Sequence, residues 1–306
     1  MRPLVNDGNP FRFTDAERLG LTRWSLSRAV GSGLLQRPLR GVYVDTTTPD
    51  TRELRIACLR LVMPPYGVAC ERTAAWLYGI SSFAPEDQEV LTPEFAVPHH
   101  RGRSGHEPIR TVEAVLPQSA IAEVDGLRVT TPLRTATDLG RRLRRPMALA
   151  ALDAFAHSGQ VTRHELAADL DRWRGFPGVI QLRDLVGVIE PKAESPGESW
   201  LRLRLLDAGF PRPRAQIEIL DAFGRVLFRL DLGYDDRCIG LEYDGREYHE
   251  GLEATARDER RRALLRSVHG WDVYGFTRAH VLGRRHGLEM FVGGLLGIEP
   301  RLPRRW

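Results

Sequence analysis

The fold of the last third of the chain is decided by two stretches, residues 228–231 (FRLD) and 239–245 (IGLEYDG). Both are apolar runs that end in acidic residues, which predicts two strands of one sheet. Glu242 and Asp244 are two residues apart, so their side chains share one face of that sheet. Asp231 lies across from them if the two strands are antiparallel neighbours.

Carboxylates that converge within a few ångströms repel one another, and this costs stability unless a cation is bound. Hard oxygen ligands select Mg²⁺ or Mn²⁺, and we predict Asp231 and Glu242 as the metal ligands. Glu198, on the preceding predicted helix, can supply a further carboxylate. A bound ion of this kind polarises a phosphodiester and lowers the pKa of a water molecule. The cluster therefore predicts a catalytic site directed at phosphodiesters.

Residues further along the chain extend this site. His249 follows Asp244 by five residues, across a turn at Gly245, and can act as a general base. Asp258, near the start of an arginine-rich predicted helix, can orient His249. A solvated helix face and an ordinary loop histidine are the alternatives. The arginines of this helix that we predict to bind DNA are Arg257, Arg261 and Arg262.

The residues around the cluster predict a C-terminal α/β domain over 191–306. It follows a linker-like stretch at 191–197, and its third strand is mainly apolar, which favours a central position in the sheet. The predicted helices are 198–208, 257–269 and 279–296, and the predicted strands are 216–220, 226–232, 237–243 and 271–276.

This set of motifs resembles the PD-(D/E)xK nuclease superfamily over about residues 194–280, nearest to the domains related to the very-short-patch repair endonuclease. The resemblance implies a restriction-endonuclease-like fold with a mixed central sheet. It implies Asp231 as the principal metal ligand beside Glu242, and His249 as the water-activating residue. It matches Asp258 and Glu198 to acidic positions of the family. Asp244 stands where the superfamily has lysine. Either His249 activates the water, or the domain binds DNA and metal without cutting well.

The first 50 residues predict a winged helix-turn-helix. The capping box at 14–17 (TDAE) starts a short helix near Asp15, and Thr22 is the N-cap of a second helix over 23–30. Strands at 34–37 and 41–44 follow, and the second helix of such a unit enters the major groove. A protein-binding adaptor is the alternative. The predicted DNA-binding residues are Arg23, Trp24, Ser27 and Arg28 of the helix, with Arg37 and Arg40 of the wing.

Residues 51–190 predict a mixed α/β middle domain. The stretches at 34–43 (LLQRPLRGVY) and 131–139 (TPLRTATDL) resemble the wing and the middle-domain signature of the AbiEi-type antitoxin family. The resemblance implies sequence-specific, often autoregulatory DNA binding by the winged helix. The histidine-rich loop at 99–106 indicates a solvated segment rather than a metal site, because its arginines repel a cation.

Composition restricts the class of protein. The chain has 42% hydrophobic and 27% charged residues, as in globular proteins, and no run approaches the ~18 apolar residues of a membrane span. Three cysteines without CxxC spacing favour a reducing cytoplasm over a disulfide framework. Lys192 is the only lysine, and 43 of the 44 basic residues are arginine. Codon bias explains this excess, and so does recognition of phosphate and guanine.

These observations predict an α/β multidomain protein that binds double-stranded DNA and carries a Mg²⁺-dependent endonuclease domain for defence or repair. The alternative is a transcriptional regulator or antitoxin-like repressor. Its nuclease-like domain would be catalytically degenerate and would serve DNA clamping or dimerisation. A homodimer and a toxin partner are compatible with either function, and a membrane association is not expected.

Overall fold

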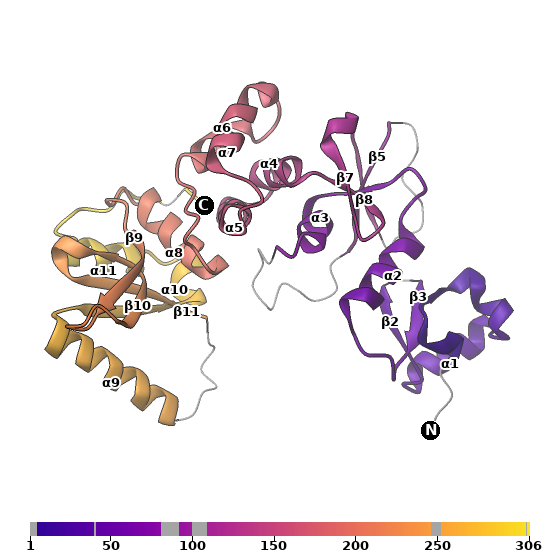
Figure 1. The fold of residues 1–306 in the computed structure, drawn as a ribbon, viewed down its shortest axis with the longest axis horizontal. Helices are drawn as coiled ribbons and strands as arrows, with labels where there is room; N and C mark the ends of the chain where they lie inside the picture. Colours follow the sequence, from indigo (N-terminus) through magenta and orange to yellow (C-terminus); the bar gives the residue numbers. More distant parts are fainter. Residues whose placement is uncertain (1–4, 40, 81–91, 100–108, 246–251, 304) are drawn as a thin grey trace. The chain divides into compact units, whose positions relative to one another are not determined.

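The computed structural model describes residues 5–39, 41–80, 92–99, 109–245, 252–303 and 305–306, with the side chains of 252–258 left out. The described chain forms two compact units (Figure 1). One comprises residues 1–79 and 85–135, and the other comprises residues 80–84 and 136–306. The protein is a mixed α/β multidomain protein with several mixed sheets. The predicted division into three domains, with boundaries at 50 and 190, stays a prediction.

The first unit opens with a three-stranded sheet in the order β1-β3-β2. The prediction of the second helix and its N-cap is confirmed, because the Thr22 hydroxyl accepts the Ser25 N–H at 3.1 Å. The predicted capping box at 14–17 is wrong. The first helix is a 3-10 helix that starts two residues before Asp15, whose carboxylate caps the Arg12 N–H at 3.2 Å. The elements are η1 (Val5–Gly8), β1 (Phe11–Arg12), η2 (Phe13–Leu19), α1 (Arg23–Gly31), β2 (Leu35–Leu39) and β3 (Val42–Asp45).

A second, five-stranded sheet completes this unit, in the order β6-β5-β4-β8-β7. Its core joins Ile56 and Leu59 of α2 to Phe95 and Val129 of the sheet. The short strands β4, β6 and β7 were not expected, because each has only two to four residues and no clear alternation. The elements are α2 (Arg52–Val62), β4 (Val68–Ala69), α3 (Glu71–Leu77), β5 (Glu94–Val97), β6 (Arg110–Glu113), η4 (Gln118–Ala120), β7 (Ile121–Val124) and β8 (Leu127–Thr130).

Helices form the first part of the second unit. Asp138 and Arg141, within and just after the 131–139 motif, form a buried ion pair at 2.8 Å, and the Arg141 guanidinium stacks on Trp173 at 4.2 Å. None of the helices in the described ranges has the length and apolar composition needed to cross a membrane. The helices are α4 (Pro132–Arg142), which starts in the first unit, α5 (Arg145–His157), α6 (Arg163–Asp169), η5 (Leu170–Trp173), α7 (Val179–Val186) and α8 (Pro196–Asp207).

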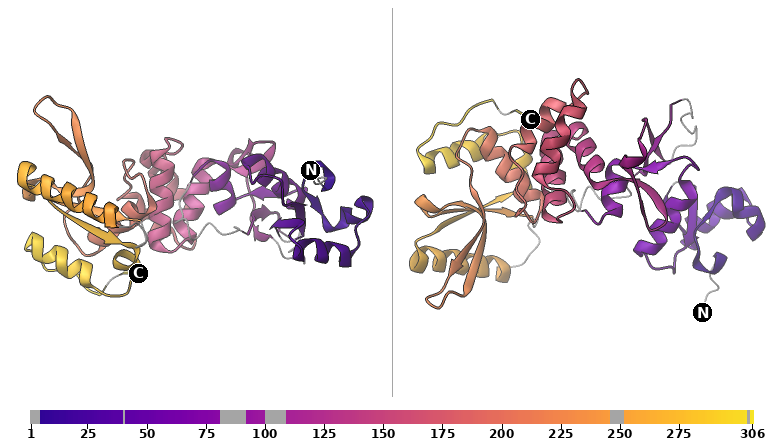
Figure 2. Two further views of the ribbon diagram at one scale, coloured as in Figure 1. Left: turned by 90° about the horizontal axis from the view of Figure 1, so that it is seen from below. Right: turned by 45° about the horizontal axis from the view of Figure 1, so that its top comes forward.

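The sheet of the second unit is mixed, as predicted, with the order β12-β11-β10-β9. Strands β9, β10 and β11 are antiparallel, whereas β11 and β12 are parallel and joined through α9. Figure 2 shows the β9–β10 hairpin extending beyond the rest of the sheet. The elements are β9 (Arg214–Leu220), β10 (Val226–Tyr234), η6 (Asp235–Arg237), β11 (Ile239–Asp244), α9 (Leu252–His269), β12 (Asp272–Thr277), α10 (Arg278–Leu282) and α11 (Gly287–Leu296).

Two boundaries in this unit differ from those predicted. Strand β11 begins at Ile239 rather than at 237, because Asp235–Arg237 forms a 3-10 turn and Cys238 adopts a positive φ of 51°. The linker expected at 191–197 ends earlier, because Pro196 and Gly197 already belong to α8, which Ser195 caps. Gly197 is required there, since a Cβ on it would lie 2.0 Å from the Tyr243 ring.

Two fully buried arginines connect α8 to its neighbours. Arg202 pairs with Asp153 of α5 at 2.6 Å. Arg204 pairs with Glu289 of α11 at 2.7 Å, and it also donates to the carbonyl oxygens of His280, Val281, Gly283 and Arg285. Buried charges of this kind persist only when they are paired and hydrogen-bonded. Helix α8 is therefore fixed to α5 on one side and to α11 on the other.

We expect the substitution Arg204→Met to lower the free energy of unfolding of the second unit by about 3–5 kcal/mol. It leaves Glu289 buried without its partner and removes the donor from the α10–α11 carbonyl groups. The matched control is Arg214→Met, because Arg214 pairs with Asp235 at 2.9 Å where both side chains are exposed. That loss should stay under about 1 kcal/mol. Urea unfolding measures both, and equal effects would contradict the assignment.

Candidate functional site

Asp231 and Glu242 lie side by side on neighbouring strands. In the antiparallel register of β10 and β11, Leu232 opposes Leu241 and Gly233 opposes Gly240. Continuing this register by one residue along both strands brings Asp231 opposite Glu242. The Asp231 carboxylate also accepts the backbone N–H of Tyr243 at 2.8 Å. This bond ties the side chain to the neighbouring strand and sets its orientation.

Glu198 reaches the same region from the first turn of α8. Its N–H donates to the Ser195 hydroxyl at 3.2 Å. Its carboxylate accepts the Glu194 N–H at 3.1 Å and the Gln216 side-chain amide at 2.8 Å. The side chain is almost fully buried. Glu198 thus combines a helix-capping role with a position close enough to Asp231 to affect its charge.

The pKa of Asp231 is raised to about 7. Burial is the largest cause, because it disfavours the charged form of the carboxyl group. The negative charge of Glu198 is the next, because it repels a second negative charge nearby. The Tyr243 N–H and Arg261 act in the opposite direction, while Glu242 adds to the increase. A carboxylate held at this pKa is a common property of functional sites, although structural networks also produce it.

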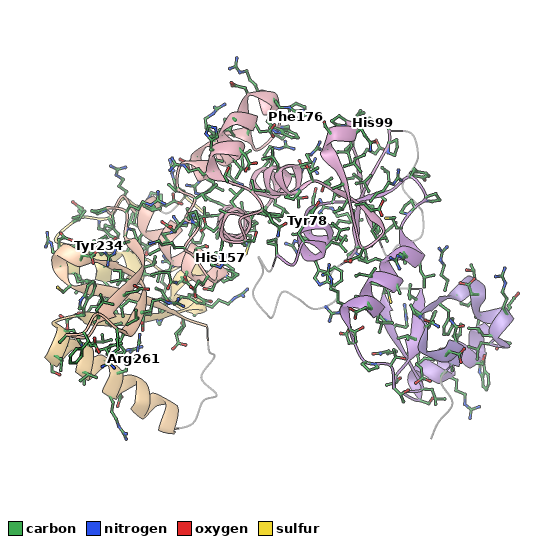
Figure 3. All side chains as sticks on the ribbon, viewed as in Figure 1. Tyr78, His99, His157, Phe176, Tyr234 and Arg261 are labelled. Atoms are coloured by element: carbon green, nitrogen blue, oxygen red, sulfur yellow. The ribbon has the colours of Figure 1, made fainter. Side chains whose placement is uncertain are left out.

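Glu242 has a built-in counter-ion. Both of its carboxylate oxygens accept from the Arg261 guanidinium, at 2.8 and 2.7 Å. Arg261, which Figure 3 labels on α9, also donates to the Arg229 carbonyl at 3.3 Å and lies over the Phe228 ring. A bidentate pair of this geometry is a strong charge-assisted contact. Arg261 is therefore engaged inside the domain, rather than on the solvated helix face that the sequence left as the alternative.

The arrangement fits a divalent cation only in part. Asp231 and Glu242 are adjacent, but Arg261 already neutralises Glu242, and Glu198 is bound to Gln216 and to a backbone N–H. Across the described ranges, no three histidine, cysteine or acidic side chains form a metal-binding group. Asp231 and Glu242 as ligands of Mg²⁺ or Mn²⁺ therefore stay a prediction.

Several other predicted site residues are only partly described. Asp244 ends β11 opposite Thr277 of β12 and is partly buried. His249 lies outside the described residues. The backbone of α9 is described at Arg257 and Asp258, but their side chains are not. The prediction that these residues lie close to Asp231 stays a prediction.

Arg262 and Arg266 of α9 contact strand β12. Arg262 lies against Gly275, where a Cβ would come within 2.7 Å of its guanidinium. Arg266 forms an ion pair with Asp272, the first residue of β12. Leu265 between them is buried among Leu230 and Val273 of the sheet. These arginines therefore dock α9 onto the sheet, a role that their spacing alone did not indicate.

A second candidate site lies on α1. Arg23, Trp24, Ser27 and Arg28 are all exposed, and Trp24 is 69% exposed. The opposite face of α1 contributes Leu26 to a small core. The helix is therefore amphipathic, with its apolar side used internally and its basic, aromatic side facing solvent.

Aromatic rings support the arginines of this surface. The Arg23 guanidinium lies 4.8 Å from the centre of the Phe13 ring, and Arg28 lies 5.2 Å from that of Trp24. On the hairpin, the exposed Arg37 lies 5.8 Å from the centre of the Tyr43 ring. Such cation–π contacts limit the motion of an arginine without occupying its N–H donors. The sequence did not indicate Phe13 and Tyr43 as supports, and Arg40 lies outside the described residues.

Gln216 is a site residue that the sequence did not indicate. It has a positive φ of 52° and donates to Glu198. A single glutamine inside a strand pattern carries no signal for either property, because both depend on contact with a helix 18 residues away in sequence.

Comparison with known proteins identifies the family. Residues 67–188 match the model of the AbiEi antitoxin C-terminal domain, and residues 1–44 match that of the transcriptional regulator, AbiEi antitoxin. Two Mycobacterium tuberculosis proteins, Uncharacterized protein Rv2248 of strain H37Rv and Uncharacterized protein MT2308 of strain CDC 1551, are each 33% identical over 253 residues. The match covers 83% of this chain and 89% of each relative. The chain belongs to one family with these two mycobacterial proteins, and its residues 1–44 and 67–188 are similar to AbiEi antitoxin domains. The resemblance of the N-terminal region is thereby confirmed, whereas neither match supports the nuclease resemblance of the C-terminal domain.

We expect Asp231→Asn to stabilise the chain at pH 8 and to leave it unchanged near pH 4. The pKa of Asp231 is higher in the folded chain than in the unfolded one, so the folded state binds more protons between about pH 4 and 7. Wild-type stability therefore falls as the pH rises through that window, and asparagine removes this loss while still accepting the Tyr243 N–H. Thermal unfolding across pH 4–8 measures the difference.

The control is Asp221→Asn, on the exposed β9–β10 turn. The pKa of Asp221 is lowered, mainly by the Arg225 N–H. Its contribution has the opposite sign, since it is present at neutral pH and lost below about pH 4. A stabilisation of Asp231→Asn that is the same at pH 4 and pH 8 would contradict the charge-based explanation.

Proposed function

We propose that this protein is a DNA-binding transcriptional regulator of the antitoxin type, and that its first 45 residues act as a winged helix-turn-helix. The observation that carries the proposal is the exposed face of α1, where two arginines, a serine and a tryptophan stand together. In such units the second helix enters the major groove. The element order of 3-10 helix, α-helix and β-hairpin is compatible with this architecture.

The side chains on α1 are suited to different parts of a DNA contact. Arginine forks bind guanine or phosphate in bidentate fashion, and serine accepts or donates to either. Trp24 offers an apolar surface of the kind that contacts a thymine methyl group. Arg37, on the hairpin, is positioned to act as a wing contact to phosphate. The same surface on an adaptor would bind protein, and an adaptor would protect no DNA site in a footprinting experiment.

For the second unit we propose a supporting role, in which the nuclease-like domain clamps DNA or dimerises. The engagement of Arg261 with Glu242 favours this role over catalysis, because the cation that neutralises the site belongs to the chain itself. The family match to antitoxins makes a toxin partner a reasonable proposal. A nucleotidyltransferase gene next to this one would strengthen it.

We expect Arg23→Ala and Arg28→Ala each to weaken binding to the DNA upstream of this protein's own gene by about tenfold. Each lost phosphate contact should also reduce the slope of log K against log salt by about 1, whereas a lost base contact should relax sequence preference. Footprinting and gel shifts at several salt concentrations measure this.

Arg163→Ala, which removes an exposed arginine from α6, is the matched control and should bind as the wild type does. The proposal fails if no protected site is found, or if protection persists when Arg23 and Arg28 are both alanine.

A second candidate function is a metal-dependent DNA endonuclease, which we propose on one observation. Burial and the charges of Glu198 and Glu242 raise the cost of ionising Asp231, as its raised pKa shows, and a cation would relieve that cost. The ion would polarise a phosphodiester when bound. Asp231 and Glu242 would hold it, and Arg261 would have to release Glu242 first.

If the second unit binds metal, 1 mM Mn²⁺ should raise the melting temperature of the wild type but not that of Asp231→Ala. Incubation with plasmid and Mg²⁺ or Mn²⁺ should then give nicks that depend on Asp231. Substrates should include duplex, mismatched, nicked and single-stranded DNA. If the wild type and Asp231→Ala are equally inert on all of them, catalysis should be abandoned.

A further inference from the structure

An open cavity of about 300 Å³ lies in the first unit, lined by strand β2 of the hairpin and by helices α2 and α3. Its apolar lining includes Leu39, Leu54, Leu59 and Trp76, together with the Cys58 thiol. Burial raises the pKa of Cys58 to about 11, so this part of the wall carries no charge at neutral pH. The volume is at the lower end of those that hold small organic ligands.

The charges on the cavity wall are unbalanced. Arg55 and Asp50 neutralise each other through two contacts of 2.8 and 2.6 Å. Arg37 also lines the cavity, and no ion pair involving it occurs in the described part of the chain. Its guanidinium rests over the Tyr43 ring, which leaves its charge uncompensated. An apolar cavity with one uncompensated cation is complementary to an apolar molecule that carries one negative group.

We infer that this cavity binds a small organic anion, with an aromatic or branched apolar body against Leu54, Leu59 and Trp76 and a carboxylate or sulfonate at Arg37. Apolar burial would supply affinity, and the charge-assisted contact would supply orientation.

The cavity also touches the least regular part of the hairpin. Gln36 pairs with Val44 and Leu39 pairs with Val42, and the register between β2 and β3 shifts in between. Arg37 and Pro38 therefore form the bulged segment, where pairing is locally disrupted. Pro38 has no N–H to donate to a ladder in any case. A ligand at this position contacts the residues of the hairpin that can shift with the least loss of hydrogen bonds.

This placement makes the ligand a regulator of DNA binding, a step that rests on the proposed function. Arg37 can contact either the anionic head of the ligand or a DNA phosphate, but it cannot fully satisfy both. Occupancy of the cavity should therefore weaken DNA binding, and it should do so through Arg37.

The test uses two fluorescent probes on the full chain. They are 1-anilinonaphthalene-8-sulfonate, which has an apolar aromatic body and an anionic group, and N-phenyl-1-naphthylamine, which has the same body without the charge. We expect saturable binding of one sulfonate probe per chain, about tenfold tighter than the neutral probe. Arg37→Gln should abolish that tenfold preference and leave the neutral probe unaffected. Cys58→Phe, which fills the cavity, should prevent binding of both.

Two further variants keep the result interpretable. Leu54→Phe narrows the same cavity from another position and should also weaken both probes, which guards against a folding defect in Cys58→Phe. Phe223→Ser removes an 83% exposed aromatic side chain from the β9–β10 turn and should change neither probe. The inference is overturned if Arg37→Gln keeps the sulfonate preference, if both cavity variants bind as the wild type does, or if Phe223→Ser removes the binding.

A gel shift then tests the regulatory step. Saturating sulfonate probe should weaken DNA binding by the wild type about tenfold and should have no effect on Arg37→Gln. If the chain binds no DNA, the proposed function fails while the probe titrations still decide the cavity. If the probes bind and DNA affinity is unchanged, the ligand site stands and its regulatory role is overturned.

Discussion

The pairing of two buried arginines on α8 is the interaction on which the second unit depends. Arg202 and Arg204 are fully enclosed, and each meets a carboxylate that is equally enclosed, on α5 and α11. An isolated charge in such surroundings would cost several kcal/mol, so neither side of either pair can be replaced alone. Because α8 also contributes Trp200, Leu201 and Leu205 to the core, its position fixes where its first turn presents Glu198.

The carboxylate site inherits its properties from this framework. Glu198 is held near Asp231 by the helix, and Glu242 is held opposite Asp231 by strand register, so the negative charges are imposed by the fold. Arg261, on α9, offsets the charge of Glu242. Burial and the charge of Glu198 still raise the pKa of Asp231. The matches to antitoxin and transcriptional-regulator models lie in residues 1–44 and 67–188, so they do not bear on this site.

The elements that sequence patterns predicted best are those with long, regular signals. Helices α1 and α8 and strands β9, β10 and β12 lie within a few residues of their predicted bounds, because amphipathic spacing and N-cap residues are local. The short strands β4, β6 and β7 escaped prediction, because two to four residues carry too little periodicity. The Thr14–Glu17 capping box was a local motif overruled by its neighbour, since Asp15 caps Arg12 instead.

By itself, the sequence determined that Asp231 and Glu242 lie on strands and that α1 carries arginines on one face, because strand alternation and helical spacing follow from residue order. Only the tertiary structure decided what these groups contact. Arg261 neutralises Glu242 across 19 residues of sequence, Gln216 binds Glu198 across 18, and Arg37 comes to line a cavity with α2 and α3. Those pairings depend on how helices dock onto sheets, and docking is settled by the burial of side chains from distant segments, which no local pattern encodes.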